Sequence, residues 1–213
     1  MTSPRTGMIA ILRGLPTNDA AEVGRCLYEA GFRMLEVPFN SPDPLGAIRV
    51  LREALPDDVV VGAGTVLDVA QVHAAQQAGA QIIVSPNTDT DVIAETVRLG
   101  MRSYPGVATA SEGFRAIRAG ARALKLFPAG HVGIPGMKAW MDVMPPETEY
   151  IPVGGINAAN IAEWVAGGAT GFGIGSFLYR PDRDQADLAA RAGEVMAAWR
   201  AAEDVRAAQA RHL

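Results

Sequence analysis

The chain has 213 residues, of which 49% are hydrophobic and 20% are charged, and its formal net charge is −4. These values are typical of a soluble domain with one sizeable core, and the negative charge argues against a nucleic-acid-binding surface. No apolar run approaches the roughly 18 residues of a membrane helix. The segment Met1–Gly7 lacks the pattern of a signal peptide. We therefore expect a cytoplasmic protein that binds neither nucleic acid nor membrane.

The chain contains one cysteine and three histidines, the residues that most often bind zinc and other transition metals. Cys26 is its only cysteine, which excludes an intramolecular disulfide and is typical of an inert core residue. The histidines, His73, His131 and His212, lack the spacing of metal ligands. A metal site would need mostly carboxylate ligands, and we predict none.

Short apolar runs alternate with longer segments of helical spacing along the whole chain. The runs are mostly rich in Val, Ile, Leu or Phe, and Gly or Pro closes nearly all of them, which indicates buried parallel strands. They lie at Met8–Arg13, Arg33–Phe39, Val59–Gly64, Gln81–Ser85, Arg102–Val107, Ala123–Phe127, Tyr150–Gly154 and Thr170–Ile174.

The segments between the runs predict helices. They lie at Thr17–Ala30, Leu45–Ala54, Asp68–Ala78, Asp89–Leu99, Ala110–Ala119, Gly136–Val143 and Ala158–Ala166. The first could be capped by Thr17, Asn18 or Asp19. Several end near a glycine that suits a left-handed cap, namely Gly31, Gly79, Gly100, Gly120 and Gly167.

About eight strand–helix units predict an α/β fold that closes into a (β/α)₈ TIM barrel. We expect residues 1–213 to form one domain, with a helical tail from about 187 to 213. The alternative is an open doubly wound sheet. Open sheets of this kind often carry a glycine-rich fingerprint that binds dinucleotides. The chain lacks that fingerprint, because Leu67 stands where a third glycine would be needed after Gly62 and Gly64.

Lys125 is an ionisable residue inside an apolar run, Ala123–Phe127. Because strand side chains alternate between faces, Lys125 points into the barrel if Leu124 and Leu126 face the helices. Burial would lower its pKa, and a neutral amine can attack a ketone to form an imine. The alternatives are an exposed lysine at a strand end and a structural ion pair.

Glu36 stands out in the same way, because Leu35 and Val37 would turn outward and Glu36 inward. Its carboxylate could pair with Lys125 or move protons during imine chemistry. The alternative is a structural partner for Arg13 or Lys125. Arg13 ends the first run, where it could hold a carboxylate or phosphate or simply be solvated at the barrel rim.

Glycine-rich turns follow the seventh and eighth runs, at Gly154-Gly155-Ile156-Asn157 and Gly173-Ile174-Gly175-Ser176. Barrels often bind phosphate at this position through backbone N–H groups, and Ser176 could add a hydroxyl donor. The alternative is that these glycines only form tight turns.

Several motifs in this order resemble those of the 2-keto-3-deoxy-6-phosphogluconate and 2-keto-3-deoxy-6-phosphogalactonate aldolases over nearly the full length. They are Leu35-Glu36-Val37-Pro38, Gly62-Ala63-Gly64-Thr65-Val66, Val84-Ser85-Pro86-Asn87, Tyr104-Pro105-Gly106, Leu124-Lys125-Leu126-Phe127-Pro128 and Val153-Gly154-Gly155-Ile156.

The resemblance implies a class I aldolase in which Lys125 forms a Schiff base and Glu36 is the general acid and base. It places Thr65, Pro86 and Phe127 at the pyruvate end, and Gly154, Gly155, Gly175 and Ser176 around the phosphate. It further implies a homotrimer without metal or organic cofactor, which acts on a phosphorylated keto acid and yields pyruvate and glyceraldehyde 3-phosphate.

One residue and one short segment bear on which epimer of the substrate is expected. Asn40 stands where the gluconate enzymes carry an arginine, and Ile9–Gly14 resembles the opening of the galactonate enzymes, in which Arg13 would contact the substrate. We therefore expect 2-dehydro-3-deoxy-6-phospho-D-galactonate as substrate. The alternatives are the gluconate epimer, both epimers, a non-covalent phosphosugar epimerase or isomerase, and a phosphosugar-binding barrel without activity.

Overall fold

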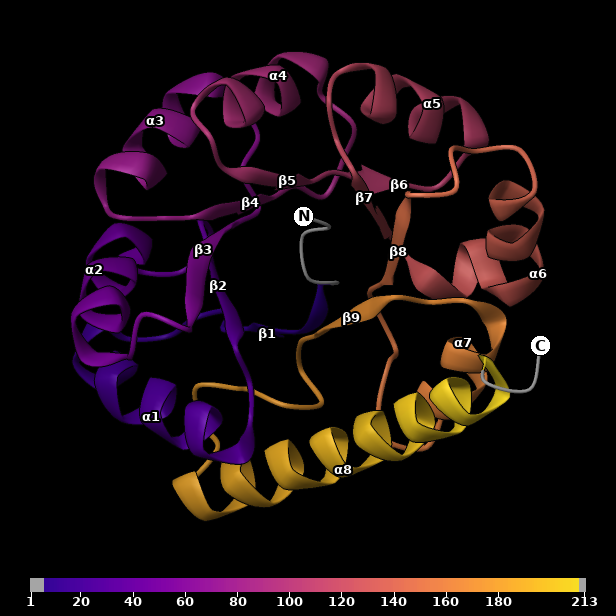
Figure 1. Cartoon of the computed structure of the whole chain (residues 1–213). Helices are drawn as coiled ribbons and strands as arrows, with labels where there is room; N and C mark the ends of the chain where they lie inside the picture. The colour runs from indigo at the N-terminus through magenta and orange to yellow at the C-terminus, as the bar shows by residue number, and fades with distance from the viewer. Residues whose placement is uncertain (1–5, 211–213) are drawn as a thin grey trace.

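A computed structural model describes residues 6–210 as a ring of parallel strands surrounded by helices (Figure 1). The strands are β1 (Gly7–Ile11), β2 (Met34–Pro38), β3 (Val60–Gly64), β4 (Ile82–Val84), β5 (Arg102–Tyr104), β6 (Gly106–Val107), β7 (Ala123–Leu126), β8 (Glu149–Pro152) and β9 (Gly171–Ile174). The helices are η1 (Thr17–Asp19), α1 (Ala20–Ala30), α2 (Pro44–Ala54), α3 (Val69–Gln77), α4 (Thr90–Arg98), α5 (Ala110–Arg118), α6 (Ala129–Met141), α7 (Ile161–Gly167) and α8 (Gln185–Ala210).

The strand order confirms the barrel. One sheet runs β5-β4-β3-β2-β1-β9 and the other β6-β7-β8, with all pairs parallel. A bridge between Val153 and Gly173 joins β8 to β9. The fifth predicted run is divided at Pro105, which has no N–H to donate. Its carbonyl still accepts a bond of 3.0 Å from the Lys125 N–H, so the ring continues across the break.

Three details of the predicted helices were wrong. None of Thr17, Asn18 and Asp19 makes a side-chain capping bond, because Pro16 precedes η1 and Asp19 has helical dihedral angles. Gly167 lies inside α7, and Gly168 is its left-handed cap at φ 110°. The sixth helix also starts at Ala129, before its predicted range, and has non-helical dihedral angles at Gly133.

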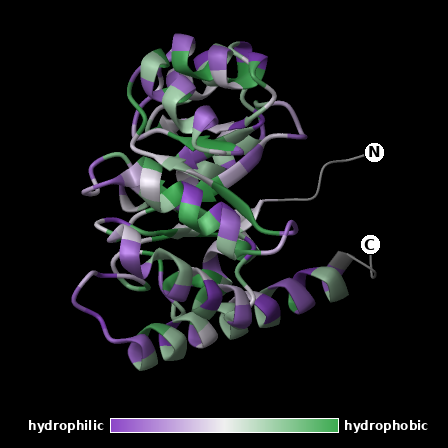
Figure 2. Ribbon diagram, turned by 90° about the vertical axis from the view of Figure 1, so that its left-hand side faces the viewer, coloured by the Kyte–Doolittle hydropathy of each residue, from purple (hydrophilic) through white to green (hydrophobic). Residues whose placement is uncertain are grey.

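The core has two layers that separate the faces of each strand. The layer between strands and helices includes Leu35, Val37, Leu124 and Leu126. The layer inside the ring consists of Ile9, Ile11, Met34, Ile82, Val84, Tyr104, Ala123, Ile151 and Val153. Figure 2 shows the apolar strands enclosed by helices of mixed hydropathy. These layers confirm the predicted orientation of the residues that flank Glu36 and Lys125.

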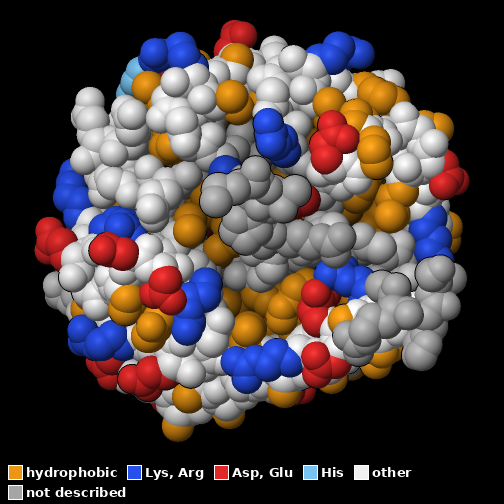
Figure 3. All heavy atoms as spheres, in the orientation of Figure 1, with side chains coloured by type: hydrophobic (Ala, Val, Ile, Leu, Met, Phe, Trp, Pro, Cys, Tyr) orange, Lys and Arg blue, Asp and Glu red, His pale blue; other side chains and the backbone are white. Residues whose placement is uncertain are grey.

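The long helix α8 lies across α1 and α7 along one side of the barrel (Figure 1). It buries Leu188, Ala192, Val195 and Met196 against the core. The predicted tail ends at residues 211–213, which lie outside the described residues, as do residues 1–5 at the other end. No helix within residues 6–210 is long and apolar enough to cross a membrane. The face in Figure 3 carries basic and acidic side chains interspersed around its rim.

Candidate active site

Lys125 lies inside the barrel on β7 and is 7% exposed. Its Nζ atom lies 4.8 Å from the centre of the Phe127 ring. Burial lowers the pKa of Lys125, and although the charge of Glu36 opposes this shift, the charge of Arg13 adds to it. The environment therefore favours a neutral amine more than water does.

Glu36 lies inside the same ring on β2 and is 2% exposed. Burial raises its pKa from 4.5 to about 7, even though the charges of Lys125 and Arg13 act in the opposite direction. Its Oε2 atom has no hydrogen-bond partner among residues 6–210. A buried oxygen without a partner is costly in a structural role, so Glu36 is suited to exchanging protons near neutral pH.

A small cavity joins the two groups. It has a volume of about 10 Å³ and is lined by Glu36, Lys125, Tyr104 and apolar side chains of the inner layer. A space of this size is about the minimum for one water molecule. The carboxyl and the amine therefore face the same confined space in the barrel interior.

Gly64 makes room for the carboxyl group of Glu36. A Cβ atom at position 64 would overlap Oε2 of Glu36. Thr65 follows at φ 54°, a left-handed conformation that is uncommon for a residue with a side chain. The motif was visible in the sequence, but the need for a glycine there depends on a side chain from the neighbouring strand.

A larger cavity of about 510 Å³ opens beyond the carboxyl ends of the strands. Six predicted site residues line it: Arg13, Phe127, Gly154, Gly155, Gly175 and Ser176. The two glycine turns after β8 and β9 therefore meet at one cavity, as barrel geometry requires. Gly154 and Gly155 have φ values of 101° and 74°, which only glycine adopts readily.

Three predicted site residues do not line this cavity within the described part of the chain: Asn40, Thr65 and Pro86. They follow β2, β3 and β4, so all three lie at the carboxyl end of the barrel. The Asn40 side chain is exposed, and Thr65 and Pro86 are half-buried. Their predicted contacts with substrate stay predictions.

Three residues that no sequence pattern had indicated also line this cavity: Phe177, Tyr179 and Arg180. Arg180 brings a second cation there, in addition to Arg13. Its position shortly after the glycine turn of the last strand was the available signal, because loops after barrel strands carry functional groups.

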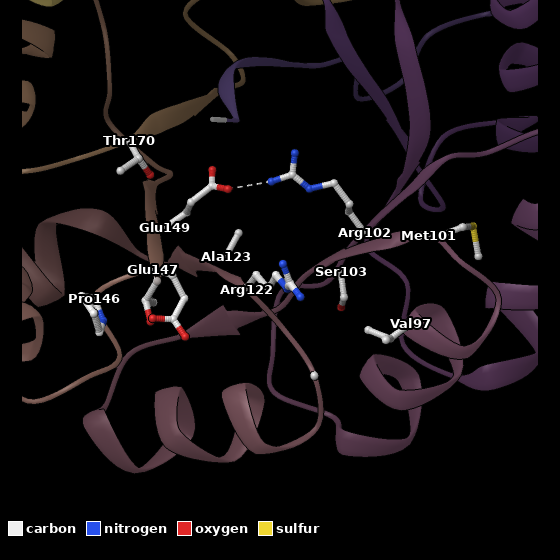
Figure 4. A pocket seen from close by; sticks show the side chains of 12 residues that line it. Val97, Met101, Arg102, Ser103, Arg122, Ala123, Pro146, Glu147, Glu149 and Thr170 are labelled. Atoms are coloured by element: carbon white, nitrogen blue, oxygen red, sulfur yellow. Dashed lines mark hydrogen bonds and ion pairs between the residues drawn. The ribbon is translucent and has the colours of Figure 1, made fainter. Parts of the chain in front are cut away.

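A third cavity, of about 440 Å³, lies near the amino ends of the strands (Figure 4). Arg102 and Glu149 form an ion pair of 2.8 Å there. The Glu149 carboxylate also accepts bonds from the N–H and hydroxyl of Thr6, at 2.7 and 2.5 Å. These charges have protein partners, and catalytic groups of barrels lie at the opposite end, so we assign this cavity no catalytic role.

Comparisons with known proteins agree with this geometry. A family profile described as "Aldolase: KDPG and KHG aldolase" matches residues 4–195. The 2-dehydro-3-deoxy-6-phosphogalactonate aldolase of Escherichia coli (strain K12) is 41% identical over 92% of this chain and 95% of its own. A structure described as "Native KDPGal structure" has a TM-score of 0.92 and 39% identity, over 95% of this chain and 98% of that one.

A more distant structure adds chemical information. The KDPG aldolase of Legionella pneumophila was solved with pyruvate captured as a covalent carbinolamine intermediate. It is 28% identical with a TM-score of 0.78, over 93% of this chain and 94% of that one. The fold, the buried lysine and these relatives define a class I aldolase, which is a lyase. The chain belongs to the KDPG and KHG aldolase family.

Proposed function

We propose that this aldolase cleaves 2-dehydro-3-deoxy-6-phospho-D-galactonate to pyruvate and D-glyceraldehyde 3-phosphate. The observation that carries the proposal is the buried Lys125 amine, which faces the same interior cavity as the Glu36 carboxyl, whose Oε2 atom has no hydrogen-bond partner among residues 6–210. Class I chemistry needs a neutral amine and a nearby group that accepts and returns protons. The lowered pKa of Lys125 and the pKa of about 7 of Glu36 suit these roles.

The proposed reaction starts with attack of the Lys125 amine on the keto carbon. A carbinolamine forms, Glu36 donates a proton to its hydroxyl, and water leaves to give an iminium ion. Glu36, as carboxylate, then takes the proton of the C4 hydroxyl, directly or through a water molecule. The C3–C4 bond breaks, its electron pair passes to the iminium nitrogen, and glyceraldehyde 3-phosphate and an enamine remain.

The return half of the cycle uses the same two groups. Glu36 gives its proton to C3 of the enamine, which produces the imine of pyruvate. Water hydrolyses this imine, releases pyruvate and restores the Lys125 amine. No metal or organic cofactor takes part in the proposed cycle.

The remaining residues are proposed to bind the two ends of the substrate. Thr65, Pro86 and Phe127 would line the pyruvate end, and Arg13 would contact the substrate near the catalytic pair. The turns with Gly154, Gly155, Gly175 and Ser176 would receive the phosphate group. Supporting this, the two turns and Arg13 line one cavity of about 510 Å³.

Borohydride trapping tests the covalent mechanism. Lys125 and Lys138 are the only lysines of the chain, and Lys138 is exposed on α6. Reduction in the presence of pyruvate is expected to add one stable pyruvyl group, which peptide mass spectrometry places on Lys125. Lys138→Met should still be modified, and Lys125→Met should not. An enzyme that cleaves substrate but remains unmodified would contradict the Schiff base and favour a non-covalent epimerase or isomerase.

The galactonate substrate is tested by comparing the two C4 epimers. We expect a higher kcat/KM for the galactonate epimer, and a shift toward the gluconate epimer in Asn40→Arg. Supporting this choice are Asn40 and the similarity of the chain to a galactonate aldolase. An unchanged preference in Asn40→Arg would remove Asn40 as the discriminating residue. Binding of both epimers without release of pyruvate would indicate a non-catalytic phosphosugar-binding barrel.

We also propose that the protein is a cytoplasmic homotrimer, as the family resemblance implies. Light scattering of the purified protein should give a mass three times that of the chain. A monomeric mass at working concentrations would contradict the trimer without affecting the proposed chemistry.

A further inference from the structure

The large cavity contains two arginines with different surroundings. Arg13 follows β1 and Arg180 follows β9, and these strands are neighbours in the barrel. Ile11, two residues before Arg13, lines the small cavity of Glu36 and Lys125, and the charge of Arg13 contributes to the pKa shifts of both groups. Among the described residues, none of the loop that carries Arg180 lines that small cavity, so Arg13 lies nearer the catalytic pair than Arg180 does. The substrate proposed above also has two anionic ends, a carboxylate and a phosphate.

The loop that carries Arg180 is held by another arginine. The guanidinium of Arg183 donates to the carbonyl oxygens of Phe177 and Leu178, at 2.6 and 2.5 Å, and pairs with Asp187 of α8 at 2.8 Å. The Arg183 side chain is only 8% exposed. Charge-assisted bonds of this kind are strong when water is excluded. Arg183 thus ties the loop to α8.

The same loop packs against the turn that follows Arg13. A Cβ atom on Gly14 would lie 2.8 Å from a ring carbon of Pro181, so the two loops meet at close range. Gly14 has a φ of 80°, which suits a glycine. The position of Arg180 at the cavity is therefore fixed from both sides, by Arg183 and by the contact of Pro181 with Gly14.

Arg180 itself is available to a ligand. Its guanidinium pairs with Asp182 at 3.4 Å, and the two side chains are 56% and 73% exposed. An exposed pair at this distance contributes little free energy. A phosphate dianion offers shorter bonds, including two-pronged ones, and can replace the aspartate at small cost. The glycine turns and Ser176 supply only neutral donors to the same region.

We propose that Arg180 binds the phosphate group of the substrate and gives the enzyme its preference for phosphorylated over unphosphorylated keto acids. This inference rests on the function proposed above. Arg183 is then a positioning residue, which holds the loop and does not touch the ligand. The two arginines of the cavity then bind different parts of the substrate: Arg13 contacts the reacting end, and Arg180 binds the phosphate.

The test compares Arg180→Gln with the wild-type enzyme on phosphorylated and unphosphorylated substrate. Loss of a charge-assisted bond to phosphate predicts a rise in KM of about 10- to 100-fold for the phosphorylated substrate, with kcat nearly unchanged. Inhibition by inorganic phosphate should weaken similarly. The kcat/KM for the unphosphorylated substrate should stay the same, and Arg180→Lys should recover part of the loss.

Arg25→Gln is the matched control, because Arg25 is exposed on α1 and does not line the cavity. It should leave all constants unchanged. Pyruvate trapping on Lys125 in Arg180→Gln shows that the variant is folded and that its imine chemistry is intact. Normal trapping with an unchanged KM for phosphorylated substrate would overturn the role of Arg180 alone. Failure of trapping in the wild-type enzyme would instead overturn the proposed function.

Discussion

Both ends of the barrel contain partly or fully buried charges, but the charges at the two ends have different partners. At the amino end, Arg102 pairs with Glu149, whose carboxylate also accepts two bonds from Thr6. At the carboxyl end, Glu36 is buried with an Oε2 atom that has no hydrogen-bond partner in the described part of the chain, and Lys125 is buried close to the aromatic ring of Phe127.

This difference shows that the residues that stabilise the barrel and the residues suited to catalysis lie at different ends of it. Where a buried charge has partners, removing one partner lowers stability because it leaves the other charge uncompensated. Unpartnered buried groups cost stability, but they remain free to exchange protons and bond to a ligand. We therefore expect substitutions at the carboxyl end to lower activity without lowering stability, and those at the amino end to do the reverse.

The largest effect is expected for Lys125→Met, which has similar volume and no amine. Cleavage should fall by about 10⁴-fold or more, because loss of a covalent nucleophile removes the main route of the reaction. The melting temperature should not fall, since an apolar side chain needs no partner in this position. Steady-state kinetics and thermal unfolding check both parts, with Lys138→Met as control. If Lys125→Met keeps substantial activity, Lys125 is not the nucleophile, and the buried charges at the carboxyl end do not serve the chemistry as expected.

Glu36→Gln should lower kcat by about 10²- to 10⁴-fold, the usual contribution of a general acid and base. Lys125 should still form a trapped adduct with pyruvate, although more slowly, because the amine remains. Rapid-quench measurements separate imine formation from bond cleavage. If all steps proceed at the wild-type rate, Glu36 is not the proton carrier.

The same variant should change how stability depends on pH. The folded-state pKa of Glu36 is about 7, above its ordinary value of 4.5, so the native state binds the proton more tightly than the unfolded state. Its contribution is fully present below pH 4.5 and is lost as the pH rises through 7. Glu36→Gln should therefore gain stability over the wild type with rising pH, up to about 3 kcal/mol by pH 8. Urea unfolding at pH 5 and pH 8 measures the difference in the free energy of unfolding between Glu36→Gln and the wild type. The same difference at both pH values would refute the raised pKa of Glu36.

Gly64→Ala tests whether the carboxyl position matters as much as the carboxyl itself. The added methyl group would displace Oε2 of Glu36, and a shift of about 1 Å in a catalytic group can cost about 10²-fold in rate. Ala63→Gly is the neighbouring control, because Ala63 belongs to the outer core layer. It should lose some stability but keep its catalytic rate. A folded Gly64→Ala enzyme with normal kcat would show that Glu36 tolerates displacement.

The strands and the inward direction of Lys125 and Glu36 could be predicted because both follow from local patterns. Apolar runs closed by Gly or Pro indicate buried strands, and alternation along a strand fixes which side chains share a face. The division of the fifth strand at Pro105 was not predicted, although it also follows from the chemistry of one residue. These features depend on neighbours in the sequence.

Features that depend on residues distant in the sequence could not be predicted. The role of Gly64 arises from Glu36 on another strand, and the place of Arg180 arises from the meeting of the Pro181 loop with Gly14. The contacts of Asn40, Thr65 and Pro86 with substrate, which the family resemblance implies, stay predictions. The ion pair between Arg102 and Glu149 at the amino end could not be predicted either, because the two residues belong to separate strands.

The smallest effect is expected at the amino end. Arg102→Met leaves the Glu149 carboxylate, which is largely buried, with only the bonds from Thr6. Because Arg102 is 36% exposed, solvent screens part of the loss, and stability should fall by about 1–2 kcal/mol. Arg98→Met removes the pair with Glu95 of the same helix, in which the arginine side chain is 64% exposed and Glu95 keeps its contact of 2.9 Å with His73, so stability should fall less than in Arg102→Met. Both variants should keep wild-type kcat and KM, because the amino end contributes nothing to the chemistry. A loss of activity in Arg102→Met at full folding would mean that the two ends are coupled through Tyr104, which packs beside Arg102 and also lines the cavity of Glu36 and Lys125.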